Sequence, residues 1–228
     1  MGLPLLEDLP DPAGKRVLLR ADFNVPLRDG RVEDDLRIRA ALPTIQWLQE
    51  RGAAVTACSH LGRPNGQPAA RYSMDPVRQR LHELAPDVKL LENLRFDPGE
   101  EANDPAFVDR LVEGQDLYVD DAFGAAHRAH ASIVGPPTRV PSAAGRLLAK
   151  EVDVLGGLLE SPRKPFVAVL GGAKVSDKLG VIDALLRRVD RLLIGGAMCF
   201  TFFAARGRPV GDSLLEEDRI ADCARLLA

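Results

Sequence analysis

The sequence is poor in cysteine, has no long apolar run and carries no large excess of one charge. Its three cysteines, Cys58, Cys199 and Cys223, are far apart, and the four histidines complete no zinc-type spacing with them. We therefore expect reduced thiols, a cytoplasmic protein and no metal site from these side chains. No apolar stretch reaches the roughly 20 residues that span a bilayer, and we expect no signal peptide. A formal net charge of -3 predicts no general attraction to nucleic acid or anionic membranes, so an anion would need a local basic cluster.

Two common phosphate-binding motifs are also absent. The 228 residues contain no GxxxxGK(S/T) loop and no GxGxxG dinucleotide fingerprint. The composition, 46% hydrophobic and 28% charged, is that of a globular protein, and the length suits one domain plus part of another.

Short apolar runs alternate along the chain with amphipathic helical stretches, a pattern typical of parallel βαβ units. We predict strands at residues 16–20, 53–58, 88–92, 116–120, 166–170 and 191–194. We predict helices at 35–51, 75–84, 143–159 and 175–189, and Pro43 should kink or break the first of them. Pro162 and Pro165 flank a short polar stretch before a new apolar strand, which indicates an interdomain hinge.

The predicted fold class is α/β, with two Rossmann-like parallel-sheet domains of three layers each. Residues 1–142 would form the first domain, 143–165 an interdomain helix and hinge, and 166–228 the first part of a second domain that is incomplete in this chain.

Polar and basic side chains follow the first four predicted strands, where open parallel sheets bind ligands. Asp22 and Asn24 follow the first strand, and Arg37 opens the first helix. The residues after the other strands are His60, Leu61, Gly62 and Arg63, then Arg95, then His127 and Arg128. A single loop arginine is usually a solvated surface group. Four guanidinium groups at one sheet edge repel one another unless an anion compensates them, so the joint pattern predicts a phosphate or carboxylate site.

A second candidate site lies where the fifth strand turns into a helix. Gly172 and Ala173 would let backbone N–H groups approach a phosphate, and Lys174 and Lys178, four residues apart, would share one helix face. Gly195 and Gly196 close the next strand in the same way. A Gly-Gly turn before a helix is weak evidence alone, because most are simple turns.

Three carboxylates near the first site, Asp22, Asp120 and Asp121, could be acid/base groups or metal ligands. For Asp120 and Asp121 we favour the alternative that they hold loop amides or arginines in place.

Seven strings in the chain resemble motifs of the phosphoglycerate kinase family, in the family's order. They are RADFNVPL (20–27), DLRIRAALPTI (35–45), SHLGRP (59–64), LENLRF (91–96), DDAFGAAHRAHAS (120–132), LGGAKVSDKLGVI (170–182) and GGAMCFTFFAARG (195–207). The resemblance implies phosphoryl transfer between 1,3-bisphosphoglycerate and ADP, giving 3-phosphoglycerate and ATP, with Mg²⁺ and in a monomer.

The resemblance also implies roles for the matching residues. Substrate-binding positions are Asp22, Asn24, Arg37, His60, Leu61, Gly62, Arg63, Arg95, His127 and Arg128. Nucleotide-binding positions are Gly172, Ala173, Lys174, Lys178, Gly195 and Gly196. Arg37, Lys174 and Gly172 would be the catalytic residues, with Arg37 and Lys174 stabilising the transferring phosphoryl group.

Two departures from the family pattern bear on these expectations. The family's nucleotide domain continues beyond the equivalent of Ala228, so the magnesium ligand is expected outside this chain. The stretch around residues 85–87 is shorter than in the family, which leaves the strand count of the first sheet open. A phosphoglycerate-binding module without catalysis, and a structural or interaction protein that keeps the fold, remain alternatives to the enzyme.

Overall fold

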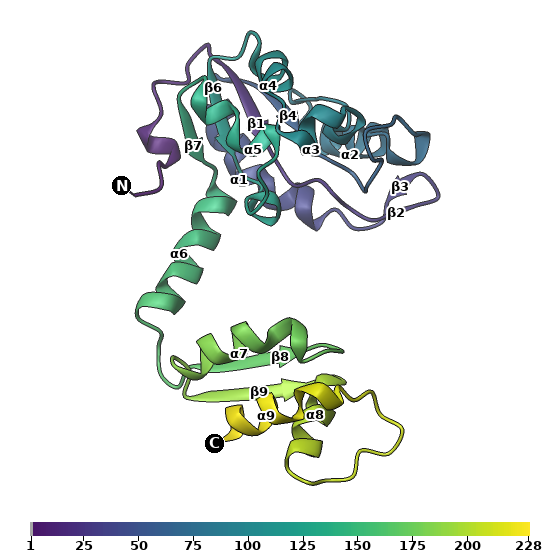
Figure 1. Cartoon of the computed structure of the whole chain (residues 1–228). Helices are drawn as coiled ribbons and strands as arrows, with labels where there is room; N and C mark the ends of the chain where they lie inside the picture. Colours follow the sequence, from purple (N-terminus) through teal and green to yellow (C-terminus); the bar gives the residue numbers. More distant parts are fainter. Residues whose placement is uncertain (1) are drawn as a thin grey trace. The chain divides into compact units, whose positions relative to one another are not determined.

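The computed structural model describes residues 2–228 and divides them into two compact units (Figure 1). The first unit ends at Val154, and the second comprises Leu155–Ala228. Helix α6 (Arg146–Glu160) begins in the first unit and ends in the second.

The first unit contains a five-stranded sheet in which all neighbours are parallel, with strand order β5-β4-β1-β6-β7. A separate antiparallel hairpin pairs β2 with β3. The strands are β1 (Arg16–Arg20), β2 (Leu27–Arg28), β3 (Arg31–Val32), β4 (Ala54–Cys58), β5 (Lys89–Leu90), β6 (Leu117–Asp120) and β7 (Ser142–Ala144). The helices are α1 (Leu36–Glu50), α2 (Asp75–Leu84), α3 (Pro98–Ala102), α4 (Pro105–Val112) and α5 (Ala131–Val134).

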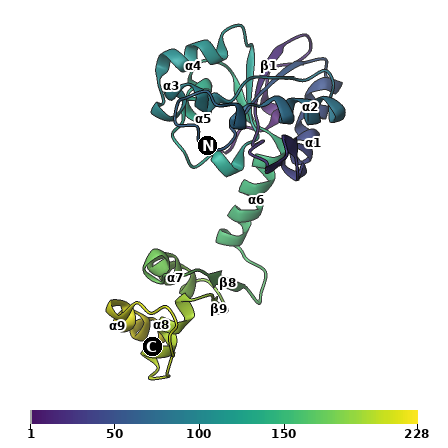
Figure 2. The same cartoon turned by 90° about the vertical axis from the view of Figure 1, so that its right-hand side faces the viewer.

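The central strand β1 is buried on both faces, and alternate residues pack against different helices. Val17 and Leu19 join a core that α1 and α2 complete, whereas Leu18 joins a core with α4 and α5. Figure 2 shows these two helix groups on opposite sides of the strands. The first unit is therefore a three-layer α/β/α sandwich, and Arg20 shares the face of Leu18 because strand side chains alternate with period two.

The fifth strand, β7, was not predicted. A helix was expected from residue 143, but Ser142–Ala144 pairs in parallel with β6, and α6 starts only at Arg146. Gly145 lies between β7 and α6 and packs against the Asp121 side chain. A Cβ at this position would lie 2.3 Å from Asp121 Oδ1. The strand assignment therefore depends on pairing with a distant segment.

Pro43 does not break α1, contrary to one expected outcome. The helix is continuous from Leu36 to Glu50 with Pro43 inside it, on the exposed side, while Ile45 and Leu48 are buried on the opposite side. The proline ring meets solvent there, so burial of the apolar face outweighs the one backbone hydrogen bond that proline cannot donate.

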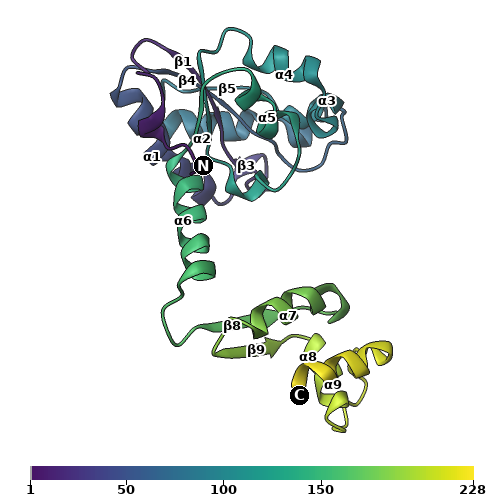
Figure 3. The same ribbon diagram turned by 60° about the vertical axis from the view of Figure 1, so that its left-hand side comes forward.

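The second unit contains two parallel strands, β8 (Val167–Gly171) and β9 (Arg191–Gly195), which lie side by side (Figure 3). The helix predicted at 175–189 is shorter: a 3-10 turn at Ser176–Lys178 precedes α7 (Leu179–Leu186). Helices α8 (Met198–Ala205) and α9 (Ile220–Leu227) complete one small core with α7. The other face of the two strands is open, because Val169 and Leu193 are 72% and 52% exposed.

Among residues 2–228, no helix combines the length and apolar character needed to cross a bilayer.

The two units should unfold in separate steps. Trp47, Tyr72 and Tyr118, the only Trp and Tyr residues of the chain, all belong to the first unit, so aromatic fluorescence reports on that unit alone. The second unit has a small core and one uncovered sheet face, which predicts lower stability. In urea, far-ultraviolet circular dichroism should begin to change before Trp47 fluorescence does. Coincident transitions would show one cooperative unit instead.

Candidate functional site

The carboxyl end of β1 brings Asp22 and Asn24 against two other segments. Asn24 Oδ1 accepts a hydrogen bond from the Gly62 N–H at 2.9 Å. Asp22 Oδ2 accepts a hydrogen bond from Nη1 of Arg37, which lies in the first turn of α1. Three of the predicted substrate segments therefore meet at this sheet edge.

Gly62 links this edge to the arginine that follows β5. Its φ of +61° lies in the left-handed region, and a Cβ there would come within 2.4 Å of the Tyr72 ring, so no other residue fits without rearrangement. Its carbonyl oxygen accepts a hydrogen bond from Arg95 Nη1 at 2.8 Å. The side chain of the neighbouring Leu61 is buried in the core. Its backbone carbonyl oxygen accepts a hydrogen bond from Asn93 Nδ2 at 2.8 Å.

Arg95 is a buried guanidinium with incomplete hydrogen bonding. Its side chain is 3% exposed, and Nε and Nη2 have no hydrogen-bond partner within residues 2–228, although Glu101 Oε1 lies 3.3 Å from Nε as an ion pair. Burial lowers the pKa of Arg95, and the charges of Arg128 and Arg20 act in the same direction. Arginine nevertheless keeps its proton, so the cluster contains a buried positive charge with two nitrogens that lack a hydrogen-bond acceptor.

His60 lies beside this cluster and is neutral. It is 6% exposed, and its Nδ1 is 3.1 Å from Arg20 Nη2. Burial, followed by the nearby charges of Arg20, Arg95 and Arg128, lowers the pKa of His60 to about 2. The histidine therefore brings a hydrogen-bonding group to the cluster but no charge.

Arg20 was missed by the sequence reasoning. It is fully buried at the end of β1, where Nε donates to Ser132 Oγ at 2.9 Å and Nη1 to the Ala21 carbonyl. Ser132 in turn donates from Oγ to Glu100 Oε1 at 2.6 Å. A charged residue ending a strand whose other inward residues are apolar is the signal that could have identified it.

The remaining predicted substrate residues are more exposed. Arg128 is half-buried, and its charge lowers the pKa of both His60 and Arg95, so it belongs to the same cluster. Arg63 and His127 are exposed, and their side chains make no hydrogen bond or ion pair with any part of the chain that the structure describes.

Asp120 and Asp121 hold backbone amides, as the favoured interpretation predicted. Asp120 Oδ1 accepts from the Ala122 N–H at 2.9 Å, and Asp121 Oδ1 accepts from the Leu147 and Leu148 N–H groups at 2.8 and 3.2 Å. Burial raises the pKa of both, that of Asp120 to about 6. Asp121 thereby connects the loop after β6 to the first turn of α6.

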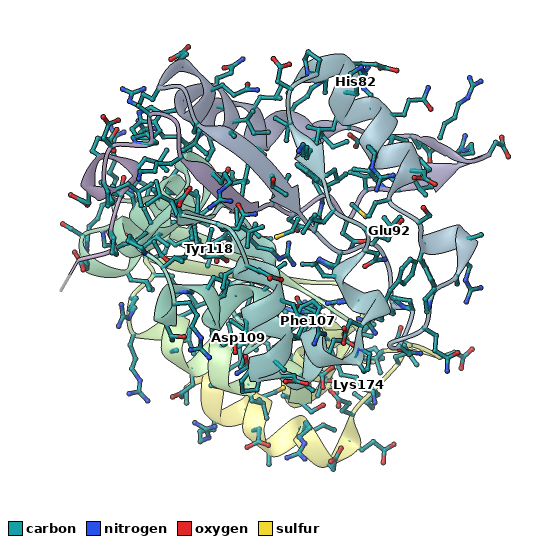
Figure 4. All side chains as sticks on the ribbon, turned by 90° about the horizontal axis from the view of Figure 1, so that it is seen from above. His82, Glu92, Phe107, Asp109, Tyr118 and Lys174 are labelled. Atoms are coloured by element: carbon teal, nitrogen blue, oxygen red, sulfur yellow. The ribbon has the colours of Figure 1, made fainter. Side chains whose placement is uncertain are left out.

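In the second unit the two glycine turns are adjacent. The Met198 N–H donates to the Gly172 carbonyl at 3.0 Å, and a Cβ on Gly196 would lie 2.7 Å from the same oxygen. Gly172, Ala173 and Lys174 are exposed, and Figure 4 labels Lys174. The helical turn starts only at Ser176, so the prediction that Lys174 and Lys178 share a helix face is wrong.

The first amides of that turn already bind a carboxylate. Glu216 accepts hydrogen bonds from the N–H groups of Val175 and Ser176 and from Ser176 Oγ. The Ser176 hydroxyl is the main cause of the lowered pKa of Glu216. The backbone amides of this turn do attract negative charge, as expected. The group that they bind is the Glu216 carboxylate, 40 residues away in the sequence, and the sequence pattern did not predict this contact. Phosphate contacts here would come from Lys174 and Lys178.

Two other features carry none of the predicted site residues. A concavity of about 800 Å³ lies between the β2–β3 hairpin, α1 and α2. Asp35 in its wall binds both Arg39 and Arg80. His82 is an exposed residue of α2 (Figure 4) whose Nδ1 is 3.2 Å from the Pro86 carbonyl oxygen. Within residues 2–228, no group of three or more His, Cys, Asp or Glu side chains could hold a metal ion.

The substitution His60→Gln should reduce the loss of unfolding free energy that occurs as the pH falls below neutrality. An unfolded histidine titrates near 6.5, whereas the folded pKa of His60 is about 2. Below 6.5 the unfolded chain therefore binds a proton that the folded chain does not, and stability falls as the pH drops towards the folded pKa. Between about pH 7.5 and pH 5, the free energy of unfolding of the unaltered chain should fall by about 2 kcal/mol more than that of the variant. Urea unfolding monitored by Trp47 fluorescence measures this difference.

Asp120 is the internal control for this comparison. Its pKa is raised to about 6, so it stabilises the fold as the pH falls through that value, but it does so equally in both proteins. Equal pH slopes for the two proteins would show that His60 is not held neutral.

Comparison with known proteins agrees with the sequence motifs. The family model "Phosphoglycerate kinase" matches residues 6–90 and 85–228. A phosphoglycerate kinase of Rubrobacter xylanophilus is 57% identical over 94% of this chain and 60% of its own length, and one of Salinispora arenicola is 51% identical over 100% and 65%. The chain thus spans about three fifths of the length of these relatives.

The solved structures give the same result. That of a phosphoglycerate kinase from Coxiella burnetii has a TM-score of 0.90 and 37% identity, covering 99% of this chain and 63% of that one. One from Pyrococcus horikoshii has a TM-score of 0.83 and 31% identity.

The family model matches this chain in two pieces. The two matched ranges overlap at residues 85–90, which include Ala85-Pro86-Asp87. The Salinispora alignment runs over 259 positions against 228 residues here, so the relative has residues without a counterpart in this chain. This chain belongs to the phosphoglycerate kinase family.

Proposed function

We propose that the chain binds 3-phosphoglycerate or 1,3-bisphosphoglycerate, as part of the reversible transfer of a phosphoryl group to ADP in glycolysis. The observation that carries this proposal is Arg95, whose buried Nε and Nη2 have no hydrogen-bond partner within residues 2–228. Buried guanidinium N–H groups without hydrogen-bond acceptors are costly, and a multiply charged anion supplies such acceptors. Family membership supports the same substrate class.

Within this proposal the basic cluster binds the phosphate that is not transferred. Arg95, Arg128 and Arg63 supply charge, and His60 supplies a neutral hydrogen bond. Asp22 and Asn24 face the triose. Their existing bonds to Arg37 and Gly62 hold these side chains in place before substrate arrives, which lowers the entropy cost of binding.

Arg37 and Lys174 are proposed to act on the phosphoryl group in transfer. Phosphoryl transfer requires positioning and charge stabilisation more than covalent catalysis, so cations placed near the equatorial oxygens stabilise the transition state. In the free protein Arg37 is paired with Asp22, so substrate would exchange this partner for the acyl phosphate. Closure of two domains about residues 143–165 would exclude water from the reaction.

The nucleotide would be ADP or ATP, bound by Lys174, Lys178 and the turns at Gly172, Ala173, Gly195 and Gly196. Mg²⁺ would accompany it and would help neutralise the phosphate charge. Residues 2–228 contain no cluster that fits a metal ion, so a protein ligand to magnesium would lie outside them. The free Cys58, Cys199 and Cys223 are compatible with the proposed cytoplasmic location, and we propose a monomer.

Binding of 3-phosphoglycerate should be detectable with the 228-residue chain and should weaken with salt. Mobile ions screen the attraction between the exposed parts of the cluster and a multiply charged anion. Calorimetric titration at low and high ionic strength measures both effects, with glycerate as the control that lacks the phosphate. Absence of binding at millimolar ligand and low salt would contradict the proposed function.

A binding module without catalysis is the second candidate function. The specific observation in its favour is that the cluster lies within the first unit, whereas the described residues of the second unit include no group of three or more His, Cys, Asp or Glu side chains that could hold a metal ion. Calorimetry with 3-phosphoglycerate and a turnover assay together separate the two candidates, because only the enzyme produces ATP.

A further inference from the structure

The least expected polar group of the first unit is the guanidinium of Arg20. Its relative exposure is 0%, yet its hydrogen bonds reach two distant segments of the chain as well as the adjacent Ala21 carbonyl. Nε donates to Ser132 Oγ, Nη1 donates to the Ala21 carbonyl, and Nη2 lies 3.1 Å from His60 Nδ1.

The contact with His60 permits only one arrangement of protons. A guanidinium has N–H donors and no acceptor, and it keeps its charge in proteins. His60 Nδ1 must therefore accept, so it carries no hydrogen. A neutral imidazole has one N–H, and that hydrogen must be on Nε2. Among residues 2–228, the hydrogen bond of the His60 ring is the one at Nδ1, which leaves the Nε2–H for a ligand.

The other end of the guanidinium is fixed in the same way. Glu100 is a buried carboxylate that accepts from the Ser132 N–H at 2.9 Å and from Ser132 Oγ at 2.6 Å. Because the Ser132 hydroxyl gives its hydrogen to Glu100, its oxygen is available to accept from Arg20 Nε. Arg20 thus donates towards both ends of the chain Glu100–Ser132–Arg20–His60: through the Ser132 hydroxyl to Glu100 on one side and to His60 Nδ1 on the other. The Glu100 charge partly compensates the Arg20 charge.

The remaining groups that face His60 oppose a positive imidazole. They are Arg95 in the 3-10 turn Leu94–Phe96, Arg128 after the 3-10 turn Phe123–Ala125, and His130 before α5. All three lower the pKa of His60, in addition to burial and Arg20. No group among these favours the protonated ring.

We propose that Arg20 is a positioning residue that holds His60 as the neutral Nε2–H tautomer, so that His60 offers a bound anion one directed donor that is unchanged across the physiological pH range. The proposal rests on the proposed function only for the identity of the anion. The arginines supply charge to the anion, and His60 supplies direction, because a neutral N–H has one fixed orientation.

The tautomer can be measured directly in the ¹⁵N-labelled 228-residue chain. Long-range ¹H–¹⁵N correlation spectra distinguish a protonated from an unprotonated ring nitrogen, and His60→Gln assigns the His60 signals. We expect a protonated Nε2 and an unprotonated Nδ1, unchanged from about pH 5 to pH 8, the range in which an ordinary histidine titrates. A protonated Nδ1, a doubly protonated ring or a titration within this range would overturn the proposal.

Arg20→Met tests whether Arg20 is the cause. If the variant folds, as judged by Trp47 fluorescence, His60 should lose its single tautomer or gain a titration. A folded Arg20→Met protein with an unchanged Nε2–H signal would overturn the role of Arg20. Should the variant fail to fold, Arg20→Lys keeps a charged group that can only donate, and the spectrum of the unaltered chain still decides the tautomer.

Binding of 3-phosphoglycerate provides a separate readout. The ratio of Kd for His60→Gln to Kd for the unaltered chain should stay constant within about twofold from pH 8 to pH 5.5, because glutamine is also an uncharged donor. The ionisation of the ligand affects both proteins and cancels in the ratio. A ratio that rises about tenfold at the lower pH would show a charged imidazole and overturn the proposal.

The two proposals can fail independently. If the tautomer is as expected but 3-phosphoglycerate does not bind, only the proposed function is contradicted. Binding with the wrong tautomer would remove the positioning role alone.

Discussion

Arg95→Met is expected to weaken 3-phosphoglycerate binding by about 100-fold while leaving the ligand-free protein as stable as before, or more stable by about 1 kcal/mol. The two effects have one cause. Arg95 is almost completely buried, and two of its nitrogens have no hydrogen-bond partner within residues 2–228. Methionine removes the buried charge and its repulsion from Arg128. It loses the hydrogen bond to the Gly62 carbonyl and the ion pair with Glu101, whose side chain is 42% exposed and remains solvated. Titration calorimetry and Trp47-monitored urea unfolding measure the two effects.

Arg110→Met is the matched control. Arg110 is exposed and ion-paired with Asp97, so its replacement should change the Kd by less than about twofold and the stability by less than about 0.5 kcal/mol. Tight binding by Arg95→Met would mean that the anion does not contact Arg95. A loss of more than about 2 kcal/mol in stability would mean that Arg95 is a structural residue, because a large cost follows from breaking a satisfied buried network.

The 228-residue chain is expected to produce no ATP, although it binds 3-phosphoglycerate. The second unit has only two paired strands, and the side chains of Val169 and Leu193 on one of their faces are mostly exposed. Lys174 and Lys178 can attract nucleotide phosphates, but residues 2–228 include no cluster that could orient a metal ion between them. Positioning accounts for most of the rate of phosphoryl transfer, so imprecise placement of the nucleotide abolishes turnover.

A coupled assay with ADP, Mg²⁺ and 1,3-bisphosphoglycerate measures this outcome, with a full-length member of the family as the positive control. Turnover by the 228-residue chain above background contradicts the prediction. Activity that appears only after adding the C-terminal part of a full-length member would support it, because that part would cover the open sheet face.

The strands and helices that sequence predicted best are those with a strong local signal. β1, β4 and β6 are short apolar runs buried on both faces, and their predicted bounds differ from the observed ones by one residue at most. Helix α2 has the predicted bounds, with a proline in its first turn. In these segments the hydrophobic pattern and the end signals indicate the same structure.

The missed features depend on partners far along the chain. The residues of β7 have no strong strand preference, and only pairing with β6 makes them a strand. Glu216 reaches the Ser176 turn across 40 residues, and Arg20 reaches Ser132 across 112. No periodicity or spacing indicates such contacts.

The candidate site shows the same division. Strand ends predicted which residues gather at one edge, and the structure brings Asp22, Asn24, Arg37 and Gly62 into contact there. The electrostatic role of each residue could not be predicted, because it depends on burial. His60 is neutral, Arg95 is charged but incompletely bonded, and Arg63 is exposed. The binding roles themselves stay predictions.

The position of β1 has a consequence for how the chain folds during synthesis. β1 is the first strand made, yet it lies at the centre of the sheet, paired with β4 on one side and with β6 on the other. The partner Val55 is made soon after Val17, but the other partner, Leu117, is made about 5–20 s after Val17 at typical translation rates. Until then one edge of an apolar strand is unpaired, in the kind of exposed state that chaperones bind. The nascent first half of this unit should therefore need protection on the ribosome that the finished domain does not.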